Sequence, residues 1–230
     1  MSGGATDVVR YTYRNAVSGF FEIPTANAQK ILPPFLQPVE AHHGHSVLSI
    51  MVFDFHDSPV GDYRELILAV PVAPRLEKGR PLPRSAFFPF VIGTTSREAR
   101  EHAIERWHLP HYMENIDIGF DVAARHVDVT ASHGNAPILA MRVTDYGWEP
   151  VEHRYQSFMS DAGCVYMANI TMKAAMSEHE EETGTLDIAA HPFTGALDLE
   201  TINTTPLREM WLRDGLQVFQ PLQQIARAGE

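Results

Sequence analysis

Three short segments with alternating apolar residues follow one another in the middle of the chain. The apolar positions are Ile116, Ile118, Phe120 and Val122, then Val127, Val129 and Ala131, then Leu139, Met141 and Val143. Side chains of a strand alternate between its two faces, so each segment is typical of a strand with one buried face. Strands this close in sequence are best joined as antiparallel hairpins. The pattern constrains the chain to a fold rich in antiparallel sheet.

Two earlier segments are apolar almost throughout. Ser46–Phe55 (SVLSIMVFDF) contains β-branched and aromatic residues in an unbroken run, which predicts a strand covered on both faces. Glu65–Ala73 (ELILAVPVA) shows the same pattern until Pro71, which has no N–H and confines that end of the strand to an edge or a bulge.

Helices are expected in three places. Thr25–Leu32 is a short candidate with Thr25 as its cap and prolines as its stop. Thr95–Trp107 is the clearest, because Thr95 and Glu98 have capping-box spacing and an apolar stripe follows at helical spacing. Pro110 requires this helix to finish near His108. A third helix is expected after Pro206, with apolar residues on one face: Leu207, Met210 and Trp211. The predicted class is α+β, with mostly antiparallel sheet.

Length and charge limit what the chain can do. The 230 residues suit one domain, 1–230, and the formal charge of −11 does not attract nucleic acid or an anionic membrane surface. The first residues lack the apolar core of a secretory signal, and no run of 18 apolar residues suggests a membrane span. Cys164 is the only cysteine. We expect a soluble, cytoplasmic protein, with the acidic run Ser177–Gly184 forming a solvated loop.

The 12 histidines raise the question of a metal. His42–His45 (HHGH) could supply ligands, but exposed histidines are common in a polar loop of this kind. Glu105, His108 and His111 are spaced three apart, but Pro110 breaks the helical geometry that would align them. The chain has no phosphate loop, no dinucleotide glycine fingerprint and no nucleophile elbow. We therefore expect no metal and no cofactor.

Lysines are scarce and one glutamate is unusually placed. Lys30, Lys78 and Lys173 are the only lysines, and a lysine amine is the group that forms a Schiff base with a carbonyl substrate. Lys173 lies in an apolar stretch, where a strand residue facing water is the simpler interpretation. Glu65 opens a strongly apolar strand, and partial desolvation there would raise its pKa and suit proton transfer.

Several segments resemble the acetoacetate decarboxylase superfamily, in order, from about Arg14 to about Val218. SPVGDYRELILAVPV is similar to the family's Gly-x-Tyr-x-Glu strand, and AREHAIERWHLPHYMENIDI resembles its helix and the following aromatic–Pro–Lys loop. ANAQKILPPFLQPV looks like its early helix, and GTLDIAAHPF followed by TTPLREMWL resembles its closing strands. The resemblance implies a cone-like antiparallel β-barrel with flanking helices, assembled into homo-oligomers.

The same resemblance implies a buried site in which a lysine condenses with a small keto acid. The family's glutamate falls on Glu65 and its substrate-binding arginine on Arg14. His111 stands where the nucleophilic lysine is expected, Tyr112 stands for its pKa-lowering neighbour, and Ile50 replaces a further glutamate. Because an imidazole cannot form the iminium, ordinary acetoacetate decarboxylase chemistry is not expected here.

Three functions remain open at this level. The first is a lyase-like enzyme acting on a small keto or carboxylate compound by acid–base chemistry. In that enzyme His111 would be the acid/base, Glu65 its partner, Tyr112 an enolate-stabilising donor and Arg14 the anion clamp. The second is a non-catalytic protein that keeps the pocket for binding a small molecule. The third is a metal-dependent variant in which histidines hold a cation.

Overall fold

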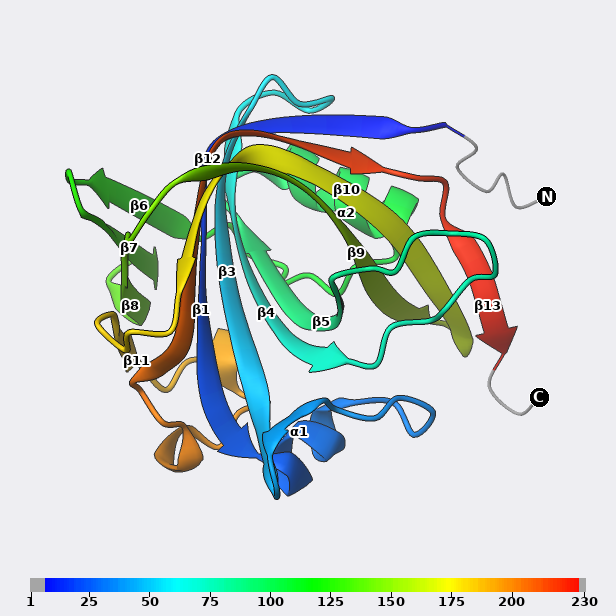
Figure 1. The fold of residues 1–230 in the computed structure, drawn as a ribbon, viewed down its shortest axis with the longest axis horizontal. Coiled ribbons are helices and arrows are strands. Elements are labelled where there is room, and N and C mark those ends of the chain that lie inside the picture. The colour runs from blue at the N-terminus through cyan, green and yellow to red at the C-terminus, as the bar shows by residue number, and fades with distance from the viewer. Residues whose placement is uncertain (1–6, 228–230) are drawn as a thin grey trace.

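The computed structural model describes residues 7–227, and its centre is a closed β-barrel (Figure 1). Around the ring the strands are β1 (Val9–Pro24), β12 (Pro206–Phe219), β10 (Cys164–His179), β9 (Glu149–Asp161), β5 (Ser85–Thr94), β4 (Tyr63–Val72) and β3 (His45–His56). β3 pairs back with β1 and closes the ring. All neighbouring pairs are antiparallel except β5 and β9. The predicted class and barrel are confirmed.

A second, smaller sheet packs against one side of the barrel. Its order is β11 (Thr185–Ile188), β8 (Ala136–Thr144), β7 (His126–His133) and β6 (Asp117–Val122). The last three strands form two consecutive antiparallel hairpins, as the alternating segments predicted. Two short strands extend the main sheet: β2 (Glu40–His42) pairs with β3, and β13 (Gln223–Arg227) pairs with β10.

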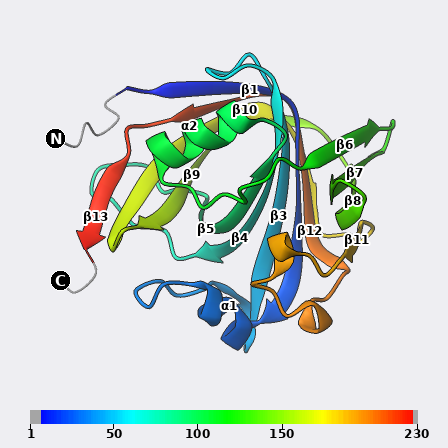
Figure 2. The ribbon, with the colours of Figure 1, turned by 180° about the vertical axis from the view of Figure 1, so that it is seen from behind.

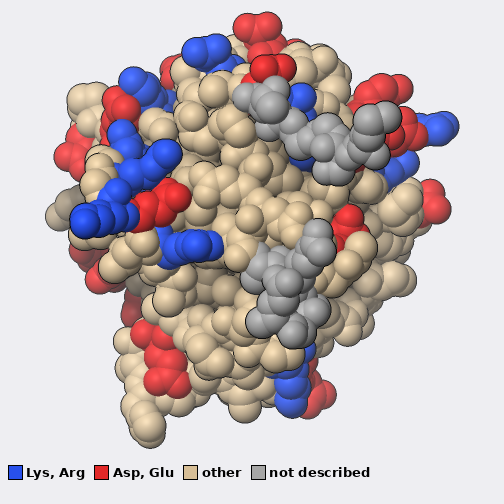
Figure 3. Space-filling model, turned by 90° about the vertical axis from the view of Figure 1, so that its right-hand side faces the viewer, with Lys and Arg blue, Asp and Glu red and all other residues tan. Residues whose placement is uncertain are grey.

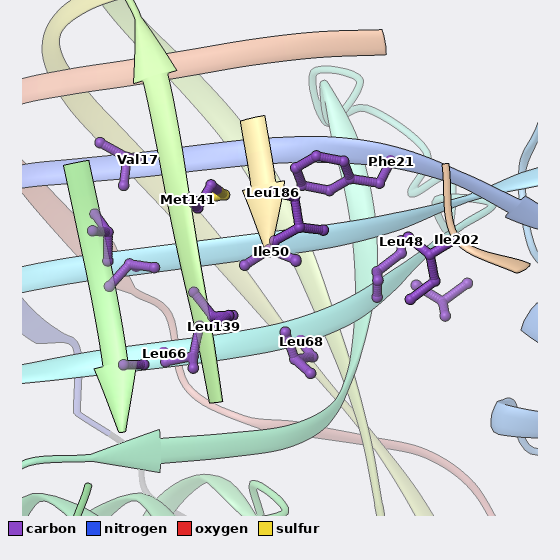
Figure 4. Packing of buried hydrophobic residues seen from close by; sticks show 14 of the residues in the cluster. Val17, Phe21, Leu48, Ile50, Leu66, Leu68, Leu139, Met141, Leu186 and Ile202 are labelled. Atoms are coloured by element: carbon purple, nitrogen blue, oxygen red, sulfur yellow. The ribbon is translucent and has the colours of Figure 1, made fainter. Parts of the chain in front are cut away.

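The barrel strands separate two apolar cores, which explains the continuous apolar runs. On β4, Leu66 and Leu68 face the second sheet, whereas Glu65 and Ile67 face the barrel interior. Figure 4 shows the outer core, in which barrel residues meet residues of the second sheet. The labelled side chains are Val17, Phe21, Leu48, Ile50, Leu66, Leu68, Leu139, Met141, Leu186 and Ile202. A strand buried on both faces has no polar side to alternate with.

Two α-helices occur in the described part of the chain, with caps that differ from the prediction. α1 (Thr25–Ile31) has Pro24, not Thr25, at its N-cap. α2 (Arg97–Trp107) begins one residue later than the capping box required, because the Ser96 side chain accepts a hydrogen bond from the Ala99 N–H. α2 ends at His108, as Pro110 predicted. Figure 2 shows α2 lying in front of β9 and β10. Two short 3-10 turns, Pro192–Thr194 and Leu199–Thr201, follow β11.

The predicted third helix is wrong, because the chain after Pro206 forms strand β12. Met210 packs in the barrel interior, whereas Trp211 packs in the outer core. Adjacent apolar residues that bury on opposite faces of a strand imitate part of a helical stripe. The acidic run is also only partly a loop, since Ser177 and His179 are buried at the end of β10.

One buried carboxylate ties β12 to the neighbouring turns. Glu209 is 1% exposed, and its oxygens accept hydrogen bonds from the backbone N–H groups of Thr144 at 2.7 Å, Thr183 at 3.1 Å and Gly184 at 2.7 Å. The Thr144 and Thr183 hydroxyls also donate to it. A buried carboxylate with this many donors is a structural element.

The surface carries mixed charge on the face that Figure 3 shows. There, Lys and Arg lie beside Asp and Glu toward the margins, and uncharged residues cover much of the middle outside the grey atoms. Among residues 7–227, no helix is long and apolar enough to cross a membrane.

Candidate active site

The barrel interior holds a cavity of about 310 Å³. Glu65 lies toward one end of it, opposite Thr94 at the end of β5, whereas Arg84 lies at the other end, just before β5 begins. Most of the wall between them is apolar, including Phe20, Met51, Phe53, Ile67, Phe87, Met172 and Met210. A concave, mostly apolar space with few polar groups is the usual form of a small-molecule site.

Glu65 is a buried carboxyl group in the cavity wall. Alternation along β4 points it inward, and it is 8% exposed. Its carboxyl has no hydrogen-bond or ion-pair partner among residues 7–227. Burial raises the pKa of Glu65 to about 8. The group is therefore protonated at neutral pH and can donate a proton.

His111 is held against the free edge of β5. Because β9 pairs only with Ser85–Phe87, the rest of that edge is open, and the loop after α2 fills it. The Ile92 N–H donates to the Pro110 carbonyl at 2.9 Å, and the Tyr112 N–H donates to the Ile92 carbonyl at 2.8 Å. His111 thereby forms a parallel bridge with Ile92.

This pairing points the imidazole toward the barrel interior. Bridge partners in a sheet share a face, and Ile92 lines the cavity, as does Leu109 two residues before His111. Both ring nitrogens are buried and have no hydrogen-bond partner among the described residues. Glu65, Ile92 and Leu109 line the cavity, whereas His111 is not among its lining residues.

Burial and, to a smaller extent, the nearby positive charge of Arg100 together lower the pKa of His111 to about 4. Arg100 lies on the inner side of α2, is 9% exposed and donates to the Asn115 side chain at 2.6 Å. The cation that lowers the pKa of His111, the residue after Pro110, is therefore Arg100 of α2. At neutral pH the imidazole is uncharged and can accept a proton.

The sheet register brings His111 and Glu65 to neighbouring positions. Ile67 pairs with Ile92, Ile92 bridges to His111, and Glu65 lies two residues from Ile67 on the same face. Two strand spacings and a two-residue offset put the Cα atoms of Glu65 and His111 about 12 Å apart.

Further polar groups in the interior have no partner. The Tyr155 hydroxyl, the Tyr13 hydroxyl and Ser49 Oγ are buried without a hydrogen bond among the described residues. Burial raises the pKa of Tyr155 to about 12, so that its phenol stays a neutral donor. Gly215 makes room for Tyr13, because a Cβ at that position would lie 2.1 Å from the ring.

Arg14 and Tyr112 are not brought to this cavity. Arg14 is half exposed, and its guanidinium lies 2.9 Å from Asp62 and 3.8 Å from Asp54. Tyr112 faces away from His111, because successive residues of an extended segment alternate. Its hydroxyl lies 3.5 Å from Nδ1 of His133, and its ring packs against His191 and Phe193.

Ile50 and the three lysines also lie outside the cavity. Ile50 is fully buried in the outer core, and its neighbours Ser49 and Met51 are the ones that face inward. Lys173 is in β10, as predicted, half exposed and paired with Glu152 at 2.8 Å. Lys30 and Lys78 are exposed.

Of the two histidine patterns noted in the sequence, only His42–His45 contributes to a cluster of possible metal ligands in the described part of the chain. His108 caps α2 in the left-handed conformation and pairs with Asp161 at 2.8 Å, so it does not gather with Glu105 and His111. His42 and His45 instead meet Glu22 of β1, forming the one group of metal-ligating side chains within reach of a single ion among residues 7–227.

Two residues of interest were missed from sequence. Arg100 has helical spacing to Ala103 and Trp107, so its place on the buried stripe of α2 was a usable signal. Glu22 is far in sequence from His42 and His45, and only the pairing of β1 with β3 brings them together.

One protein-family model matches most of the chain. A family model described as acetoacetate decarboxylase (ADC) matches residues 3–183. No curated protein sequence matches the chain. Among solved structures, an acetoacetate decarboxylase from Legionella pneumophila aligns with a TM-score of 0.66 at 15% identity, over 99% of this chain and 90% of that one.

Two further structures show the same fold. The enduracididine biosynthesis enzyme MppR, complexed with pyruvate, aligns with a TM-score of 0.68 at 10% identity, covering 98% of this chain and 93% of that one. An acetoacetate decarboxylase-like enzyme from Sphingomonas wittichii aligns with a TM-score of 0.57 at 10% identity, over 96% and 94% of the two chains. At these identities the likeness concerns the fold alone.

Proposed function

Because the chain belongs to the acetoacetate decarboxylase family, as the match over residues 3–183 shows, we propose that it is an enzyme acting on a small keto or carboxylate compound inside the barrel. Its chemistry is proton transfer between the substrate and two side chains. Glu65 is the acid and His111 is the base.

The observation that carries this proposal is the opposite displacement of the pKa values of two groups on the same face of the barrel wall, Glu65 and His111. Burial raises the pKa of Glu65 to about 8 and lowers that of His111 to about 4. At neutral pH the carboxyl therefore holds a proton and the imidazole does not. Titratable groups whose environments separate their pKa values in this way are typical acid and base pairs.

The reaction step is enolisation. His111 removes a proton from the carbon next to the substrate carbonyl, the C–H electron pair becomes the enol double bond, and Glu65 donates its proton to the carbonyl oxygen. Returning a proton to carbon, or expelling a β-hydroxyl as water, gives isomerisation or dehydration. Burial, with the nearby positive charge of Arg100, keeps His111 neutral before the step. The Tyr155 hydroxyl lies toward the Arg84 end of the cavity, away from Glu65, where it can donate to a distal group of the substrate.

The positions of the lysines support a mechanism without a Schiff base. None of the three lines the cavity, and the nearest counterpart in the family pattern is His111. Borohydride reduction in the presence of a keto acid is expected to leave no substrate attached to the protein. Attachment at Lys173 would show that a lysine is the nucleophile after all.

The direct test is hydrogen–deuterium exchange at the α-carbon of a panel of 2-keto and 3-keto acids, followed by NMR in D₂O. General acid–base catalysis contributes roughly 10²–10⁴ in rate, so His111→Ala should lose exchange by about that factor. His108→Asn is the matched control, since it lies three residues away, pairs with Asp161 and occupies a left-handed position that asparagine tolerates. Equal exchange by wild type and His111→Ala would remove His111 from the mechanism.

A binding protein without chemistry is the second candidate, and the apolar wall of the cavity favours it. It predicts that a keto acid raises the melting temperature of the protein while α-exchange stays at the rate of the uncatalysed solution. Accelerated exchange that depends on Glu65 and His111 would exclude it.

A further inference from the structure

Three potential metal ligands converge at one rim of the barrel. Oε1 of Glu22 lies 2.9 Å from Nε2 of His42 and 2.5 Å from Nδ1 of His45. The two imidazole rings are stacked with their centroids 4.8 Å apart. The three ligand atoms all lie within 4.8 Å of one another.

Strand pairing brings these three residues together. Glu22 on β1 pairs with Val47 on β3, and His45 lies two residues from Val47 on the same face. His42 on β2 pairs with His45 across the hairpin, whose turn contains Gly44 at φ +79°. The Thr25 N–H donates to the Gly44 carbonyl at 2.9 Å and anchors that turn to the start of α1. Three adjacent strands therefore contribute one ligand each.

The cluster borders the cavity but is far from Glu65. Phe20, Val47 and Ala41 line the cavity, and each lies within two residues of a cluster member on its own strand. Glu65 pairs with Phe53, eight residues along β3 from His45, which corresponds to about 26 Å of strand. Glu22 is the least exposed of the three side chains, at 21%, and both imidazoles are accessible from solvent.

We propose that Glu22, His42 and His45 form a binding site for a first-row transition-metal dication, with zinc as the representative ion. Two imidazole nitrogens and a carboxylate oxygen are a ligand set that such ions accept, at about 2.0–2.2 Å for zinc. Three protein ligands leave at least one coordination position open. The site is too far from Glu65 for a bound ion to take part in proton transfer there.

The test is direct metal binding to untagged, chelator-treated protein. Zn²⁺ titration by calorimetry is expected to give one site per chain, and Co²⁺ is expected to give a visible absorption band of a low-coordinate site. Mg²⁺ and Ca²⁺ should not bind, because imidazole is a poor ligand for hard cations. Mutating a residue that only supports a metal ligand typically lowers metal affinity by about 10–100-fold. The direct-ligand variants Glu22→Gln, His42→Ala and His45→Ala should therefore each lower the affinity for Zn²⁺ by at least about tenfold.

His43→Ala is the matched control, since His43 is exposed in the same turn and outside the cluster. It should keep the affinity of wild type within about twofold, and Zn²⁺ should raise the melting temperature of wild type and of this control alike. Absence of one-to-one binding would overturn the proposal. So would unchanged affinity in Glu22→Gln, or an equal loss in His43→Ala, because either result would indicate non-specific binding by loop histidines. α-Exchange activity is a separate readout that does not depend on these variants.

Discussion

Replacing Glu65 by glutamine should make the protein more stable at neutral pH. The folded carboxyl has a pKa of about 8, against 4.5 for the same group in an unfolded chain. Between these two values the folded state binds one more proton than the unfolded state, so stability falls as pH rises through this window. The wild-type protein therefore loses free energy of unfolding from about pH 4.5 to about pH 8, and Glu65→Gln does not.

The size of the effect follows from the same numbers. The difference between variant and wild type grows by about 1.4 kcal/mol per pH unit, which gives about 3 kcal/mol between pH 5 and pH 7. For a chain of 230 residues this corresponds to a difference in melting temperature of roughly 6–12 °C. Glutamine keeps the shape of the side chain and leaves it uncharged, so that packing contributes little to the difference.

Urea unfolding of both proteins at pH 5, 6, 7 and 8 measures this difference directly. Glu101→Gln is a suitable control, because Glu101 is exposed on α2 and paired with Arg97. A difference that is constant from pH 5 to pH 8, or that favours wild type at pH 7, would refute the reasoning. It would mean that the carboxyl is ionised inside the barrel and that its role as an acid is wrong.

Three other results are expected. Arg100→Gln should raise the pKa of His111 above about 4, measured by NMR titration of the imidazole, whereas Arg97→Gln on the exposed side of α2 should leave it unchanged. The rate of α-exchange should fall below about pH 4, as His111 gains a proton, and above about pH 8, as Glu65 loses one; a rate that is flat across either limb would contradict the assignment. Glu209→Ala should destabilise the fold by roughly 3–5 kcal/mol in urea unfolding, because it leaves three buried N–H groups without an acceptor, and a loss below about 1 kcal/mol would show that water replaces the carboxylate.

The strands could be predicted from sequence because burial determines where apolar residues occur along a strand. The hairpins of the second sheet have one solvent-exposed face, so apolar and polar residues alternate along the sequence from Ile116 to Val143. The barrel strands are buried on both faces, which predicts strands but gives no period. β12 was mistaken for a helix for this reason. Met210 and Trp211 are buried on opposite faces of the strand, whereas the prediction put them on one side of a helix.

The candidate site could be predicted only where alternation alone decides the direction of a side chain. Glu65 follows from its place in an apolar strand. His111 depends on a bridge to Ile92 that no local pattern reveals, and the same bridge turns Tyr112 toward His133. Arg14 lies at an irregular position of β1, where the register with β3 shifts between Tyr13 and Asn15, and it points to Asp62 instead.

The interior polar groups argue that the cavity has a function. The Tyr13 and Tyr155 hydroxyls, Ser49 Oγ and both nitrogens of His111 are buried without partners in the described chain, and each such group costs roughly 1–3 kcal/mol. Glu65 adds a further cost at neutral pH. Apolar residues of similar size would remove these costs, as they have along most of the same wall. A barrel kept only as a scaffold has no reason to retain unpartnered polar groups in its interior, whereas a ligand with a carbonyl or carboxylate could form the hydrogen bonds that these groups lack within the described chain.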